Sequence, residues 1–230
     1  MNMGRNKGSY KRMRELVLKQ NTCLIEDLTN EPIQWICPNR ENGKELQLTG
    51  KATLNCLGLS EDLFLGFWPQ RSPQWDGMFI AKQSKTLYLI EAKSHLAEIS
   101  RGNKLAKQYN KEQEANYNMK CKSLRSLMSN FKVDDSKEDI WLHKYYQISN
   151  RIAFHLKTKE VLPNKKINNV KLVFLNFVND PDWISVGKHA SENDWKKKYD
   201  TIFKEMGINK EQFTENEIFI WNVDASRLKR

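Results

Sequence analysis

The chain has 230 residues and a formal net charge of +10, from 38 basic and 28 acidic side chains. This length suits one α/β domain over residues 1–230, because two full domains would each have only a small core. The four cysteines lack CxxC spacing, which argues against a structural zinc site or a disulfide framework. No apolar run approaches membrane-spanning length and no signal peptide is recognisable. We therefore expect a cytoplasmic protein without a membrane partner.

Basic residues are concentrated in two segments, 1–20 and 101–132, which hold few acids. Such segments favour a polyanionic partner, because neutralising phosphates releases counterions. The alternative is a basic surface that only keeps the chain in solution. We expect a nucleic-acid partner, with contacts from Lys104, Lys107 and Lys111.

Apolar periodicity predicts helices and strands in alternation along the chain. A helix over 9–20, which Ser9 can cap, is followed by a short strand at 33–37 and a helical stretch at 51–66 with a break near Gly58. The later elements are strands at 76–82 and 86–93, a largely helical stretch at 100–130, a long helix at 138–158, a buried strand at 171–178, a helix at 191–206 stopped by Gly207, and a strand at 217–223. This mixture indicates α/β architecture, with a central sheet covered by helices.

The strands at 76–82 and 86–93 carry the informative polar residues. An antiparallel hairpin that turns at residues 83–84 sets three pairs opposite each other: Ile80 and Leu87, Met78 and Leu89, Asp76 and Glu91. Opposed residues share a face, and Lys93 lies two residues beyond Glu91 on that face. Three charged groups are therefore expected to converge at one edge of an apolar sheet.

Two carboxylates that lie this close repel each other, and a divalent cation held by oxygen ligands removes the repulsion. Such a cation lowers the pKa of a bound water and offsets charge that develops on a phosphate. A lysine beside it can orient or deprotonate the water, or stabilise a pentavalent phosphorane. Asp76, Glu91 and Lys93 thus supply the groups for phosphodiester hydrolysis. The plainer alternative is a charged strand end that emerges into solvent.

This Asp76…Glu91-Ala92-Lys93 pattern resembles the PD-(D/E)XK nuclease superfamily, which has the restriction-endonuclease-like fold. The segments FWPQRSPQWD at 67–76 and EAKSH at 91–95 resemble a poorly characterised bacterial branch. That branch also shows a Tyr-Gln-x-x-Asn-Arg helix, matched at 146–151, and an apolar strand ending in Asn-Asp, matched at 175–180. The matches span residues 67–180, about half of the chain. One departure is that Trp75 stands where a proline is expected, with Pro73 two residues earlier.

The resemblance implies a central mixed β-sheet flanked by helices. It implies Mg²⁺ or Mn²⁺ held by Asp76, Glu91 and the carbonyl of Ala92, with Lys93 serving the attacking water. The superfamily often adds a glutamate from an N-terminal helix, for which the candidates are Glu15, Glu41 and Glu45. The Trp-x-x-Pro segment at 35–38 favours Glu45.

Further polar residues could serve the same site. Gln147 and Arg151 lie on one face of the predicted helix at i, i+4, and could reach the metal site or a phosphate. Their alternative interpretation is a solvated helix surface. Gln74 shares the face of Asp76 and could contact substrate, while His95 continues the face of Glu91 but could be incidental. We include Gln147 in the expected catalytic set, and Gln74 and Arg151 among the expected nucleic-acid contacts.

These features together predict a Mg²⁺-dependent nuclease that hydrolyses phosphodiester bonds in nucleic acid, with DNA as the expected substrate. A homodimer is the assembly that many members of this fold adopt. Two alternatives stay open: a nucleic-acid-binding module that has the fold without catalysis, and a phosphohydrolase of small nucleotides. The intact triad argues against the first, and the basic segments argue against the second.

Overall fold

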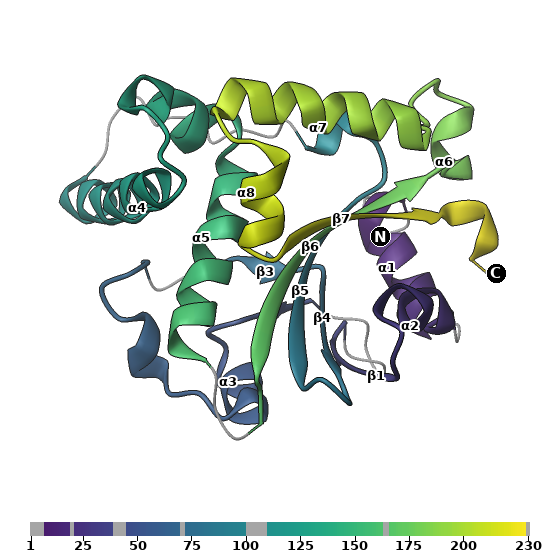
Figure 1. The fold of residues 1–230 in the computed structure, drawn as a ribbon, viewed down its shortest axis with the longest axis horizontal. Helices are drawn as coiled ribbons and strands as arrows, with labels where there is room; N and C mark the ends of the chain where they lie inside the picture. The colour runs from purple at the N-terminus through teal and green to yellow at the C-terminus, as the bar shows by residue number, and fades with distance from the viewer. Residues whose placement is uncertain are drawn as a thin grey trace.

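A mixed five-stranded sheet runs through the middle of the protein in this computed structural model (Figure 1). The structure describes residues 7–18, 21–38, 45–69, 72–99, 110–162 and 166–228. Lys104, Lys107 and Glu41, which the sequence singled out, lie outside these ranges. None of the helices within them is long and apolar enough to cross a membrane.

The sheet has the strand order β1-β4-β5-β6-β7. Its strands are β1 (Ile33–Cys37), β4 (Gly77–Ala81), β5 (Thr86–Lys93), β6 (Asn169–Val178) and β7 (Ile218–Asp224). The first three strands pair antiparallel, whereas β5, β6 and β7 run parallel. A separate two-stranded sheet pairs β2 (Leu46–Gln47) with β3 (Gln74–Trp75). The predicted α/β class and the mixed central sheet are thus confirmed.

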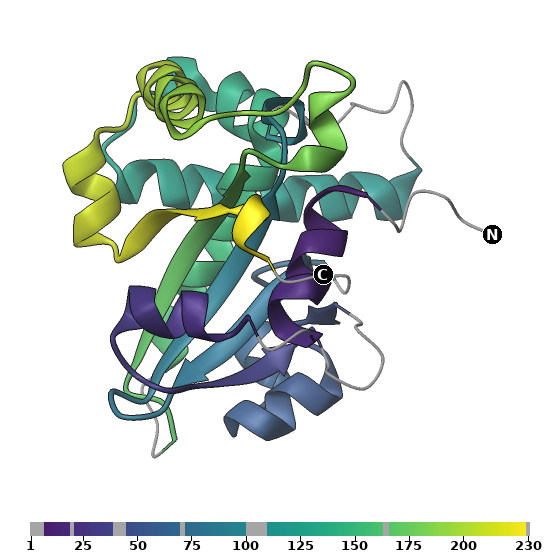
Figure 2. The same cartoon turned by 90° about the vertical axis from the view of Figure 1, so that its right-hand side faces the viewer.

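Helices cover both faces of the sheet. On one face lie α1 (Gly8–Leu18) and α2 (Cys23–Thr29), and Figure 2 shows α1 in front of the strands. The opposite face is covered by α3 (Lys51–Leu57), α4 (Lys111–Asn130), α5 (Tyr146–Val161), α7 (Glu192–Met206) and α8 (Lys210–Glu215). The short helix α6 (Pro181–Ile184) follows the end of β6. Strand β5 is buried over its whole length, because it lies between two strands and between two layers of helices.

The hairpin of β4 and β5 has the predicted register. Met78 pairs with Leu89 and Ile80 with Leu87, and both Leu87 and Leu89 face the larger helical layer. At the turn, which occupies residues 82–85, β4 ends at Ala81, one residue earlier than expected, whereas β5 spans the expected 86–93. Asp76 itself lies in a bend between β3 and β4, one residue before the ladder begins.

The prediction of a continuous helix over 138–158 is wrong. Residues Ile140–Lys144 form a π-helical turn, closed by a 2.8 Å hydrogen bond from the Tyr145 N–H to the Ile140 carbonyl, and α5 starts only at Tyr146. Tertiary contacts explain this interruption: the Trp141 indole N–H donates to the Met206 carbonyl over 2.9 Å, and the Tyr145 hydroxyl donates to Glu205 over 2.6 Å. Both side chains are thereby held against α7.

Capping residues in the sequence correctly predicted several helix ends. Gly58 and Gly207 end α3 and α7 in the left-handed conformation, and Ser191 caps α7. Ser60 caps a 3₁₀ turn at Glu61–Phe64 rather than a further α-helical turn, so the stretch 51–66 is only partly α-helical. The expected cap Ser9 is wrong, because α1 already begins at Gly8.

Candidate active site

The bend before β4 brings Asp76 to the end of β5. Its Oδ2 accepts a 2.7 Å hydrogen bond from the backbone N–H of Ala92. The preceding Trp75 is fully buried and anchors this bend in the core. Asp76 is thus held next to Glu91 and Lys93, as the predicted hairpin register requires.

Glu91 is the most enclosed of the three, with 2% of its surface exposed. It points toward α5, because it shares the face of Leu87 and Leu89 along β5. Its Oε1 accepts from the Lys93 ammonium and from Gln147 Nε2 at 2.6 Å. Its Oε2 accepts from Arg151 Nε at 2.5 Å. Three donors from two elements therefore satisfy both oxygens of this carboxylate.

Helix α5 supplies two of those donors from successive turns. Beyond Glu91, Arg151 donates to the Gln74 carbonyl at 2.9 Å and to Asn150 Oδ1 at 2.8 Å, and its guanidinium lies 5.0 Å from the centre of the Trp75 ring. The other oxygen of the Gln147 amide, Oε1, is buried and accepts no hydrogen bond within the described residues. The i, i+4 pair predicted on this helix therefore reaches the candidate site.

Glu45 joins the site from the segment before β2. Its carboxyl lies within interaction distance of that of Asp76. Burial and the nearby charge of Glu91 raise the pKa of both Glu45 and Asp76. Of the two described candidates, Glu15 and Glu45, the structure brings Glu45 to Asp76, and Glu41 lies outside the described residues.

The pKa of Glu91 is shifted in the opposite direction from those of Glu45 and Asp76. Burial alone would raise its pKa, but the charges and hydrogen bonds of Arg151 and Lys93 outweigh burial and lower it. The site therefore divides into a carboxylate whose pKa is lowered by two cationic side chains and a carboxyl pair whose pKa values are raised. Losing a proton from that pair would place uncompensated negative charge beside Glu91.

This donor set fits a hard divalent cation in its chemistry. Glu45 and Asp76, whose pKa values are raised by burial and by the charge of Glu91, are carboxyls suited to such a cation, and Gln147 Oε1 is a buried acceptor without a donor within the described residues. As they lie, however, the described residues contain no group of three or more His, Cys, Asp or Glu side chains arranged to hold a metal ion. The obstacle is visible at Glu91, whose oxygens face Lys93 and Arg151 instead of Asp76.

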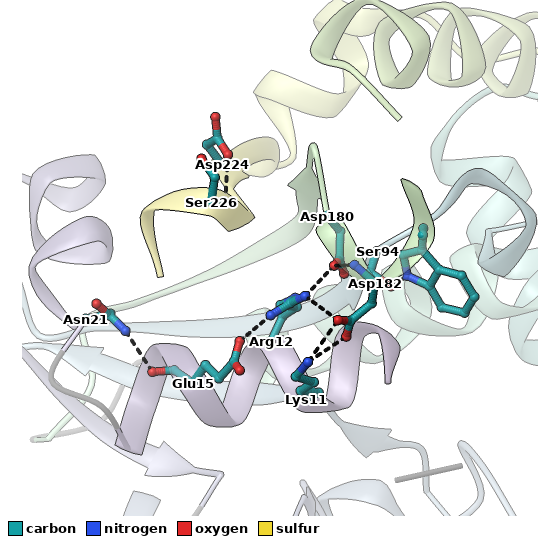
Figure 3. Close-up of polar contacts among 10 residues, drawn as sticks. Lys11, Arg12, Glu15, Asn21, Ser94, Asp180, Asp182, Asp224 and Ser226 are labelled. Atoms are coloured by element: carbon teal, nitrogen blue, oxygen red, sulfur yellow. Dashed lines mark hydrogen bonds and ion pairs between the residues drawn. The ribbon is translucent and has the colours of Figure 1, made fainter. Parts of the chain in front are cut away.

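Glu15 belongs to a different polar network (Figure 3). It accepts a 2.6 Å hydrogen bond from Arg12, which also donates to Asp180 over 2.5 Å. Lys11 pairs with Asp182 at 2.8 Å in the same network. Two of the basic residues of segment 1–20 are therefore neutralised inside the fold and tie α1 to the turn after β6.

The remaining predicted residues lie around the site in different ways. Gln74 is exposed and adjoins Trp75, and Lys111 is exposed in the first turn of α4. His95 is buried and packs at 4.3 Å against Trp183, 3.6 Å from Glu98. From the second basic segment, Lys120 lies over the ring of Tyr146 at 5.8 Å, beside Gln147.

One contributor was missed from the sequence. The Gln74 carbonyl accepts from the guanidinium of Arg151, a contact that depends on the packing of α5 against β3, while the neighbouring Asn150 accepts from the same guanidinium. Asn150 carried a usable signal, because it lies within the same helical motif as Gln147.

Comparison of the chain with models of protein families, with curated proteins and with solved structures returned no match. The class shown by the fold is α/β, with a mixed five-stranded sheet between layers of helices.

Proposed function

We propose that this chain is a divalent-cation-dependent nuclease of the restriction-endonuclease-like type. The observation that carries the proposal is the convergence of Asp76, Glu91 and Lys93, joined by Glu45, at one edge of the central sheet. Burying several carboxyls together lowers the stability of a fold. Clusters of this kind, with shifted pKa values, are characteristic of functional sites.

Asp76, Glu45, Glu91 and the carbonyl of Ala92 would hold Mg²⁺ or Mn²⁺. When bound, that cation supplies an activated water and offsets charge on the phosphate. The Lys93 ammonium lies at the same carboxylate, where it can orient the attacking water and stabilise the negative charge of the phosphorane. The free Oε1 of Gln147 can accept a hydrogen bond from that water and so direct its lone pair.

The substrate side of the proposal rests on charge. The net charge of +10 favours a polyanion, and Lys120 brings part of the second basic segment next to α5. DNA is the substrate we propose. The salt dependence distinguishes this proposal from a small-nucleotide phosphohydrolase. Binding of a nucleic-acid polymer weakens steeply as salt rises, whereas turnover of a small nucleotide would change little.

The test is cleavage of plasmid DNA and of a labelled single-stranded oligonucleotide, with Mg²⁺, Mn²⁺ or EDTA. We expect cleavage with either cation, none with EDTA, and none by the Lys93→Gln variant. Lys210→Gln, a change at the exposed start of α8, is the matched control and should cut like the parent. No cleavage of any nucleic acid by the parent with either cation would contradict the proposal.

A further inference from the structure

Glu91 is already fully engaged by the protein. Lys93 and Gln147 bind Oε1, and Arg151 binds Oε2 over 2.5 Å. Oε1 accepts from two donors, and Oε2 can bind a cation only in competition with the charge of the Arg151 guanidinium. Asp76, in contrast, accepts from the Ala92 N–H and has no cationic side chain bonded to it within the described residues, and Glu45 lies against it.

Arg151 does not depend on Glu91 for its position. Its Nη2 is held by the Gln74 carbonyl, its Nη1 by Asn150, and its plane lies against the Trp75 ring. Only the Nε–H is committed to Glu91. If Glu91 turned toward Asp76, the guanidinium would keep these contacts and expose one donor.

We propose that Arg151 competes with the divalent cation for Glu91, holding this carboxylate in the cation-free protein and releasing it when the cation binds. This inference rests on the proposed function. The released Nε–H needs a new acceptor in a buried site, and a phosphodiester oxygen is the group that a guanidinium binds best. Arg151 is thus a positioning residue that exchanges Glu91 for substrate phosphate.

The exchange has a thermodynamic signature in the absence of nucleic acid. Every cation that binds must first break the pair between Arg151 and Glu91. Removing Arg151 should therefore tighten cation binding while it destabilises the cation-free protein, since a buried carboxylate loses its partner. A residue with only a structural role would lower stability without tightening the binding of the cation.

The experiment is calorimetric titration of the full chain with Mn²⁺, with thermal unfolding measured at zero and saturating Mn²⁺. Arg151→Gln should bind Mn²⁺ roughly tenfold more tightly than the parent. Its melting temperature should be lower without Mn²⁺, and the deficit should shrink at saturation. Arg125→Gln is the matched control, because Arg125 forms an exposed pair with Glu138, and it should bind like the parent.

Gln147→Leu separates competition from charge, and it serves if Arg151→Gln fails to fold. Gln147 is neutral and is one of two donors to Oε1 of Glu91, which then accepts from Lys93 alone, so Mn²⁺ binding should tighten without any change in the charge of the site. Unchanged or weaker binding in both variants, with a parent that binds Mn²⁺ and cuts DNA, would overturn this inference alone. A parent that neither binds Mn²⁺ nor cuts nucleic acid would overturn the proposed function as well.

Discussion

The carboxylate of Asp76 accepts a 2.7 Å hydrogen bond from the backbone N–H of Ala92. This bond joins the bend before β4 to the end of β5, next to the carbonyl that we expect to bind the cation. Asp76 therefore has two roles, one in closing this edge of the hairpin and one in the proposed site, and substitutions can separate them.

Asp76→Asn should abolish Mn²⁺ binding and DNA cleavage together while the protein keeps its fold. Asparagine retains an oxygen that can accept the Ala92 N–H, and it removes a buried carboxyl that lies close to Glu91. Melting temperature without Mn²⁺ should be equal to or above that of the parent. Calorimetry, single-turnover cleavage and thermal unfolding measure the three quantities. Parent-like cleavage by this variant would remove Asp76 from the site.

Lys93→Ala should keep Mn²⁺ binding and lose most of its DNA cleavage. Mn²⁺ should stay bound, and bind more tightly, because a positive charge is lost beside Glu91. The cleavage rate should fall by about 10²-fold to 10⁴-fold, the scale of lost acid–base help. Single-turnover kinetics at saturating Mn²⁺ isolate the chemical step. Loss of Mn²⁺ binding in this variant would reverse the roles assigned to Asp76 and Lys93.

Gly77→Ala should destabilise the protein by about 1–3 kcal/mol. A Cβ at Gly77 would lie 2.7 Å from Met13 Cε and 3.3 Å from Ile90 Cβ, so the buried Met13 side chain must change its place or α1 must shift. Urea unfolding measures the loss. In a double-mutant cycle with Met13→Ala, the combined cost should be smaller than the sum of the two single costs. Strict additivity would show that α1 is not the element that clashes.

Arg12→Met should cost about 3–5 kcal/mol, since it leaves Asp180 and Glu15 as buried carboxylates without their partner. Arg125→Met breaks an ion pair at the surface instead and should cost about 0–1 kcal/mol. Urea unfolding of both variants at neutral pH gives the comparison. Equal losses would mean that the network around α1 adds no more stability than a surface pair.

Stability should fall in acid partly through His155. Burial lowers its pKa from 6.5 to about 4, while its Nε2 lies 2.7 Å from the Asn216 carbonyl. Below pH 6.5 the unfolded chain takes up this proton and the folded chain does not, so stability is lost as the pH falls toward 4. This group alone should remove ~2 kcal/mol between pH 7.5 and 5.

The measurement is urea unfolding at both pH values for the parent, His155→Gln and the exposed His189→Gln. His155→Gln should show the smaller drop, since the other titrating groups are common to all three proteins. His189→Gln should behave like the parent. An equal drop in all three would assign the acid sensitivity to other groups.

The hairpin could be predicted because its determinants are local. Both strands are short apolar runs on either side of residues 82–85, and a turn at 83–84 gives the register that opposes Met78 and Leu89. Glu91 and Lys93 then follow from the two-residue period of a strand. Short elements such as α6 were not expected, since four residues carry too little periodicity.

The partners of Glu91 were harder to foresee. Arg151 is 60 residues away in sequence, and its contact depends on how α5 packs on the sheet. Helical spacing showed that Gln147 and Arg151 share a face, but not which carboxylate that face meets. The approach of Glu45 to Asp76 depends on the pairing of β2 with β3, which no local pattern specifies.

The π-helical turn at Ile140–Lys144 sets the angular phase of α5. Each α-helical residue advances the chain by about 100°, so one residue more or less in this turn would rotate Trp141 around the axis relative to Arg151. The anchor on α7 and the approach to Glu91 could then not both be kept. This stretch can accept changes in side chain, but its length is under constraint, and an insertion or deletion there would be felt at a carboxylate nearly fifty residues away in sequence.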